Sequence, residues 1–197
     1  MKKYDITKQA KIINISLAGV MLAAGVVIAV FSSLPDLAVK ILIGSLLIIT
    51  GVGKVLGYFS NDIYRLAFQF DLAIGVTDAI LGILTYFLAD TVYPTLATGM
   101  GIYVILDSLL KVQTGLDARR FGMKSWLGIL ISSAAISLFG IASMLAAHLV
   151  IPSNIAIGAA MATDAVQNMW ITMYTVRVRA KKKSFEVDFD IKEDDGK

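Results

Sequence analysis

Long hydrophobic runs separated by short polar segments make up most of this chain. Each run has about the 20 residues that a helix needs to cross some 30 Å of hydrocarbon. The runs lie at about residues 12–33, 37–58, 68–89, 94–114, 126–147 and 151–174. Strands of a membrane barrel are shorter and alternate polar with apolar positions. The pattern therefore predicts an all-α integral membrane protein with six transmembrane helices.

One sequence pattern returns every 57 residues. GSLLIITGVGKV begins at Gly44, GIYVILDSLLKV at Gly101 and GAAMATDAVQNM at Gly158. A fixed period of this length indicates copies of one supersecondary unit. Each copy is expected to be two helices joined by a proline-containing turn. The turns are SSLPD (32–36), ADTVYP (89–94) and HLVIP (148–152).

The three repeats span about residues 12–59, 68–116 and 125–176 of a single membrane domain, residues 1–180. Because each repeat contains two spans, all three enter the membrane from the same side and are related by an axis along the membrane normal. We therefore expect three parallel repeats in a pseudo-threefold bundle. The sequence leaves open whether the first or the second helices of the repeats line its centre.

Composition and charge agree with this architecture. The chain is 57% hydrophobic and 17% charged, and its mean hydropathy is +0.75. Basic residues collect on one side of the predicted spans, which predicts that both termini lie in the cytoplasm. These residues are Lys2, Lys3, Lys8, Lys11, Arg65, Arg119, Arg120, Lys124, Arg177, Arg179 and Lys181 to Lys183. The first span resembles a signal peptide, but its removal would leave one repeat incomplete, so we expect it to be retained.

The last residues, 181–197, change from basic to acidic and are expected to form a disordered cytoplasmic tail. The basic part is suited to contact with anionic lipid. The alternation in FEVDFDI weakly indicates a strand that pairs with a partner protein. We expect the lipid bilayer as the main partner and no nucleic acid, and the sequence leaves homo-oligomerisation open.

Polar residues recur inside the apolar helices at i, i+4 spacing. The pairs are Thr50/Lys54, Asp107/Lys111 and Asp164/Asn168, and Asp78 lies at a similar depth. A charged residue at the bilayer centre costs about 2.5 to 3.5 kcal/mol on insertion scales. The aspartates are therefore expected to face inward.

Two interpretations of the aspartates remain open. They either hold helices together through hydrogen bonds, or they form a proton-responsive or ion-conducting path. Lys111 can pair locally with Asp107, whereas Asp78 and Asp164 have no basic neighbour on their own helix. Burial without a counter-charge favours the protonated form of a carboxyl group.

The remaining charged positions have simpler interpretations. Lys54 and Lys111 are expected to extend toward the headgroups, and Asp71 either pairs with Lys54 or reaches the interface. The chain has no cysteine, and its one histidine, His148, lies in a turn, so we predict neither a metal nor a cofactor. Small residues are expected to mediate helix packing. They are Gly44, Gly51, Gly75, Gly82, Gly101, Gly140 and Gly158, with Phe139 where the repeat leads one to expect glycine.

Short catalytic motifs are absent from the sequence, and the connections are too short for a catalytic domain, so we expect no enzyme.

The three repeats resemble the HdeD-type acid-resistance membrane proteins over residues 10–180. The second helix of each repeat opens with an apolar residue and glycine, at Ile43-Gly44, Met100-Gly101 and Ile157-Gly158. The resemblance implies a protein of the cell (inner) membrane with a role in acid or general stress tolerance and no defined molecular activity. The alternative is a small proton-coupled secondary transporter or channel.

Overall fold

The computed structural model describes residues 3–31, 34–59, 70–87, 92–146, 148 and 150–175. The predicted tail, residues 181–197, lies outside this part of the chain. The described residues form six helices and no strand, which confirms the all-α prediction. The helices are α1 (Lys3–Val30), α2 (Asp36–Tyr58), α3 (Asp71–Tyr86), α4 (Val92–Arg120), α5 (Trp126–Met144) and α6 (Ser153–Thr175).

Four of the six helices are long and apolar enough to cross a membrane, which makes this a multi-pass membrane protein. These segments are Lys11–Val30, Asp36–Tyr58, Tyr93–Arg120 and Trp126–Met144. Helix α3 falls short in length because its described part has 16 residues. Helix α6 is long enough, but Asn154, Asp164 and Gln167 lower its mean hydropathy, and these three side chains are buried against other helices.

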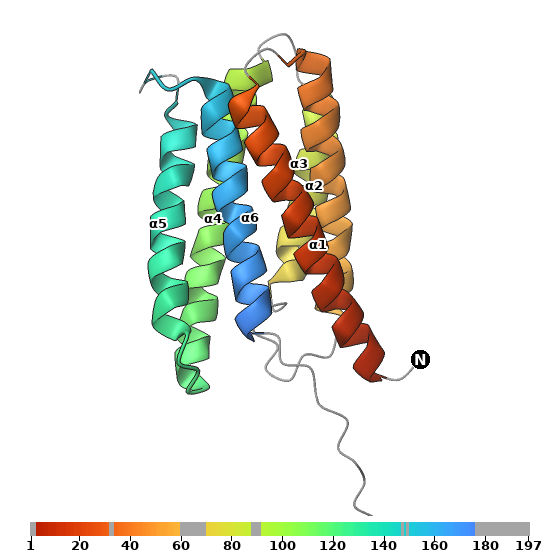
Figure 1. The fold of residues 1–197 in the computed structure, drawn as a ribbon, viewed down its shortest axis with the longest axis vertical. Helices are drawn as coiled ribbons and strands as arrows, with labels where there is room; N and C mark the ends of the chain where they lie inside the picture. The colour runs from red at the N-terminus through yellow and green to blue at the C-terminus, as the bar shows by residue number, and fades with distance from the viewer. Residues whose placement is uncertain are drawn as a thin grey trace, which may run out of the picture.

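The helices pack most extensively in three pairs, α2 with α3, α4 with α5, and α6 with α1. Figure 1 shows α4 and α5 on the left, α6 and α1 in the middle, and α2 and α3 on the right. The two helices within each predicted hairpin contact each other less, and α3 makes few or no contacts with α4. The closest packing therefore joins the second helix of one hairpin to the first helix of another.

Glycines allow the close approach within each pair. A Cβ atom on Gly51 of α2 would lie 2.5 Å from the carbonyl oxygen of Gly75 on α3, and one on Gly44 would lie 3.0 Å from that of Gly82. In the same way, a Cβ on Gly158 of α6 would lie 2.3 Å from the carbonyl oxygen of Gly25 on α1. In a membrane, where the hydrophobic effect does not drive helices together, backbone contact of this kind supplies the packing energy.

The pair α4 and α5 uses Gly101 and Gly140 for the same contact. A Cβ on Gly101 would lie 2.5 Å from the carbonyl oxygen of Gly140, while Phe139 is 46% exposed on the outside of the bundle. Gly140 therefore occupies the contact position that the period of 57 assigns to Phe139. One additional residue between Gly101 and Gly140 shifts the register of α5.

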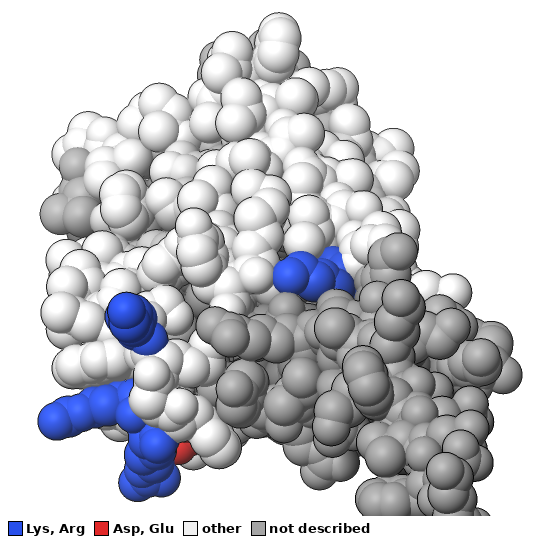
Figure 2. All heavy atoms as spheres, turned by 60° about the horizontal axis from the view of Figure 1, so that its bottom comes forward, with Lys and Arg blue, Asp and Glu red and all other residues white. Residues whose placement is uncertain are grey.

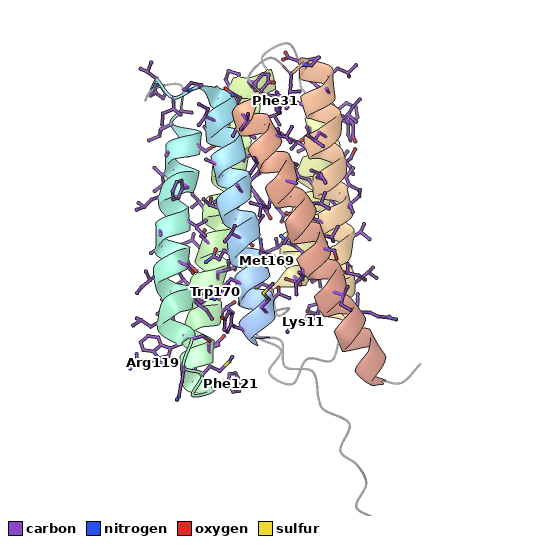
Figure 3. All side chains as sticks on the ribbon, viewed as in Figure 1. Lys11, Phe31, Arg119, Phe121, Met169 and Trp170 are labelled. Carbon is purple, nitrogen blue, oxygen red and sulfur yellow. The ribbon has the colours of Figure 1, made fainter. Side chains whose placement is uncertain are left out.

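The interior differs between the two ends of the bundle. Toward the end that lacks the N-terminus, the core is apolar and tightly filled by residues including Ile28, Val39, Ile43, Ile157 and Met161. Toward the end that holds the N-terminus, it contains buried polar and charged side chains. In the face that Figure 2 shows, basic side chains also lie near this end, where Arg119, Arg120 and Lys124 are exposed.

Candidate functional site

A group of polar side chains meets in the centre of the bundle. Helices α2, α4 and α6 supply most of it, and α3 contributes two carboxylates. We call this group the polar cluster; it consists of Lys54, Asp71, Asp78, Tyr103, Asp107, Lys111, Asp164 and Asn168. Except for Asn168, which is partly buried, every member is buried. The second helices of the predicted repeats thus supply most of the polar centre.

Lys111 on α4 lies between two carboxylates. It forms an ion pair with Asp107, one turn earlier on the same helix, and its Nζ donates a hydrogen bond of 2.8 Å to Oδ1 of Asp164 on α6. Asn168 also donates, from Nδ2 to Oδ2 of Asp164 at 2.9 Å. Asp164 has no basic neighbour on its own helix, as the sequence indicated, and α4 supplies its counter-charge across the interface.

Lys54 on α2 plays a similar part in the other half of the cluster. Its Nζ lies 3.0 Å from Oδ2 of Asp78 on α3 and donates a hydrogen bond of 2.8 Å to the hydroxyl of Tyr103 on α4. Asp78, which also has no basic neighbour on its own helix, is therefore paired across a helix interface as well. Both lysines are buried, so the prediction that they extend toward the headgroups is wrong. The aspartates draw them inward because an unpaired buried carboxylate is costly.

Tyr103 was not predicted as part of the site. It lies one helical turn before Asp107 and two turns before Lys111, so all three residues share one face of α4. This spacing of four residues was the signal in the sequence that could have identified Tyr103. A phenol at such a position can accept a hydrogen bond from a buried ammonium group without adding charge, which helps to stabilise Lys54 in an apolar environment.

Asp71 takes neither of its two expected positions. It is only 7% exposed, so it does not reach the interface, and no ion pair with Lys54 is found. Its Oδ2 is buried without a hydrogen-bond partner. Thr50 lies next to the cluster, but its hydroxyl donates to backbone oxygens of its own helix, at 2.8 Å to Leu46 and 3.1 Å to Leu47.

Two small polar cavities adjoin the cluster and share Asn14, Lys54 and Asn168. One, of about 20 Å³, extends to Thr50, Tyr103 and Asp164. The other, of about 30 Å³, is closer to the N-terminal end; its polar lining is Asn14, Lys54, Asp71, Asp107, Lys111, Thr114, Asn168 and Thr172. Each volume has room for one or two water molecules.

A larger, mostly apolar cavity of about 270 Å³ lies between α3 and α4, where these helices hardly touch. Its walls include Ile74, Leu106 and Leu110, and it reaches Tyr103 and Asp107 of the cluster. Here a cavity of ligand size adjoins the polar centre.

The charges of the cluster do not balance when all groups are ionised. It contains four aspartates, Asp71, Asp78, Asp107 and Asp164, against two lysines, Lys54 and Lys111. The excess negative charge has to be compensated by protons or by bound cations. Among the described residues, no group of three or more acidic or histidine side chains lies close enough to hold a metal ion.

Apolar helices that enclose a buried cluster of acids and lysines define a multi-pass membrane protein with a charged centre. The chain matches the family model described as "Short repeat of unknown function (DUF308)" twice, over residues 17–87 and 73–151. Together these matches cover more than half of the chain, which therefore belongs to this family. Searches of curated proteins and of solved structures gave no match.

Proposed function

We propose that this protein spans the membrane six times and supports acid or general stress tolerance, as the resemblance to HdeD-type proteins implies. The observation that carries the proposal is the position of Lys111, buried between Asp107 and Asp164. Protonation of Asp164 removes the ion pair that joins Lys111 of α4 to α6, and protonation of Asp107 removes the pair within α4 that helps to hold Lys111 in place. Acidification would then loosen this interface and change the packing or permeability of the bundle.

We further propose a pseudo-threefold arrangement of three parallel repeats. The glycine contacts support it, because Gly44, Gly101 and Gly158 are 57 residues apart and each lies against a glycine of the paired helix. We propose an inner-membrane location with cytoplasmic termini, which the positive-inside rule supports through Arg119, Arg120 and Lys124. We also propose a role other than catalysis, which the absence of short catalytic motifs from the sequence supports.

Liposomes test the proton response directly. The purified full-length protein is reconstituted, a pH gradient is imposed, and its decay is followed in a buffer whose only cation is the large N-methylglucamine. We expect decay faster than in empty liposomes for the wild type and for Asp36→Asn, whose side chain is exposed, and slower decay for Asp107→Asn/Asp164→Asn. Equal decay in all variants, together with equal acid survival of cells that carry them, contradicts the proposal.

A small proton-coupled secondary transporter is the second candidate, and the apolar cavity between α3 and α4 favours it. This cavity joins apolar walls to Tyr103 and Asp107, as binding sites for small organic molecules commonly do. If it binds a substrate, Ala73→Phe fills part of it and abolishes substrate-dependent proton movement. The same variant leaves the substrate-free decay of the pH gradient unchanged.

A further inference from the structure

Among the described residues, the small polar cavities beside the cluster lie toward the end of the bundle that holds the N-terminus. Both polar cavities adjoin residues in the half that holds the N-terminus, such as Asn14 and Lys54. The other half of the axis is filled by Ile28, Ile43 and Ile157, which are completely buried. Because polar side chains beside water-sized cavities favour ions and a filled apolar core does not, the N-terminal end is the expected side of entry.

Asp71 is the member of the cluster that faces the outer cavity without a partner. It begins α3, lines the cavity of about 30 Å³, and its buried Oδ2 accepts no hydrogen bond. The other oxygen-bearing side chains around this cavity include the neutral Asn14, Thr114, Asn168 and Thr172. Asp107 also lines this cavity, but it pairs with Lys111, so Asp71 is the carboxylate of the lining that has no partner. An unpaired carboxylate together with neutral oxygens suits a hard cation.

The charges that face Asp71 from the neighbouring helices leave room for an added positive charge. Lys54 on α2 and Lys111 on α4 line the same cavity, but Lys54 pairs with Asp78 and Lys111 with Asp107 and Asp164. The polar residues of α6 that line this cavity are the neutral Asn168 and Thr172. The two lysines are thus already engaged by three carboxylates, and Asp71 is a fourth.

Size and coordination restrict the identity of the cation. About 30 Å³ of space holds one or two water-sized particles and excludes organic cations. Calcium requires six to eight oxygen ligands, usually with several carboxylates, and the described residues contain no such acidic group. A monovalent ion of the size of sodium fits both conditions.

We propose that the cavity at Asp71 binds one small monovalent cation such as sodium, which enters from the end that holds the N-terminus. Asp71 is its charged ligand. Thr114, Asn168 and Thr172 offer neutral oxygens within the same cavity. The inference goes beyond the proton response, because a cation can bind at Asp71 whether or not protonation of Asp107 and Asp164 changes the packing of the bundle.

Binding of radiolabelled sodium to the purified full-length protein tests the site. We expect saturable binding of one ion per chain, with the dissociation constant raised at least tenfold by Asp71→Asn and unchanged by Asp36→Asn, whose carboxylate is exposed. Sodium should also raise the unfolding temperature of the wild type relative to N-methylglucamine. Trp126 and Trp170 report this unfolding by fluorescence. No saturable binding, or equal binding by Asp71→Asn, overturns the proposal.

The absence of native cysteines provides a second test, which does not depend on the folding of Asp71→Asn. Single-cysteine variants Thr114→Cys, in the cavity, and Ile157→Cys, in the apolar half, are treated with membrane-impermeant thiol reagents in spheroplasts and in inverted vesicles. We expect Thr114→Cys to react only from the side where an N-terminal tag is cleaved by added protease. A cationic reagent should react faster than an anionic one, and Ile157→Cys should not react. An unreactive Thr114→Cys, or a reaction from the opposite side, contradicts the proposal.

Discussion

Lys111 and Asp164 lie 53 positions apart in the sequence, and their charged groups meet at 2.8 Å in the centre of the bundle. The contact joins α4 to α6, two helices that belong to different predicted hairpins. Asp107 forms an ion pair with the same ammonium group, so one lysine pairs with two buried carboxylates. Removal of the lysine alone leaves buried carboxylates without a counter-charge, whereas removal of the lysine together with both aspartates does not.

Lys111→Met should destabilise the folded bundle by about 3 to 5 kcal/mol, because it leaves Asp107 and Asp164 without their counter-charge. Denaturant unfolding in detergent measures this change. The triple variant Lys111→Met/Asp107→Leu/Asp164→Leu should recover most of the loss, because it removes the uncompensated charges as well. A triple variant that is no more stable than Lys111→Met contradicts the assignment.

Arg120→Met is the matched control for Lys111→Met. Arg120 also pairs with an aspartate one turn earlier, Asp117, at 3.2 Å, but its side chain is 81% exposed. Exposed pairs contribute about 0.2 to 1 kcal/mol. The two substitutions remove the same kind of ion pair, so a similar loss of stability in both would show that burial is not the decisive factor.

Tyr103→Phe should lower the stability of the bundle by about 1.5 to 3 kcal/mol, because it removes a hydrogen bond of 2.8 Å from a charged donor, Lys54. The ring remains, so the packing of α4 is conserved. Tyr58→Phe, at an exposed position at the end of α2, is the control and should change stability little. Thermal unfolding compares the two, and equal shifts would show that the buried hydrogen bond contributes nothing.

Gly51→Ala should separate α2 from α3, because the added Cβ would lie 2.5 Å from the carbonyl oxygen of Gly75. Overpacking of this kind typically costs about 1 to 3 kcal/mol. Gly99→Ala places the same methyl group where no atom lies within 4 Å, and it should stabilise α4 by about 0.5 to 1 kcal/mol. The two substitutions should change the free energy of unfolding in opposite directions. A similar loss of stability in both variants contradicts the contact between Gly51 and Gly75.

The register of α5 is tested by substitutions at two adjacent positions. Gly140→Ala should destabilise the pair α4 and α5 by about 1 to 3 kcal/mol, because the new Cβ would lie 2.9 Å from the carbonyl oxygen of Gly101. Phe139→Ala removes an outward-facing ring and should have a smaller effect. A larger loss of stability for Phe139→Ala would contradict this register and favour the one that the period of 57 predicts, with position 139 at the contact.

The sequence predicted the parts of the site that depend on position along a helix. The i, i+4 spacing of Asp107 and Lys111 predicted their ion pair, because residues four apart lie on one helix face. It could not predict the partners of Asp78 and Asp164, because Lys54 and Lys111 reach them across helix interfaces. Tyr103 was missed for the same reason, since its partner Lys54 belongs to another helix.

The sequence by itself determined that this is a helical membrane protein, because a run of about 20 apolar residues is stable in hydrocarbon only as a helix whose backbone hydrogen bonds are internal. It also determined which residues are costly to expose to lipid. Only the tertiary structure decided which helices pair, that Gly140 and not Phe139 makes the contact with Gly101, and that both buried lysines turn inward. The physical reason is that apolar periodicity is a property of one helix, whereas close backbone contact and ion pairing depend on how two helices approach each other.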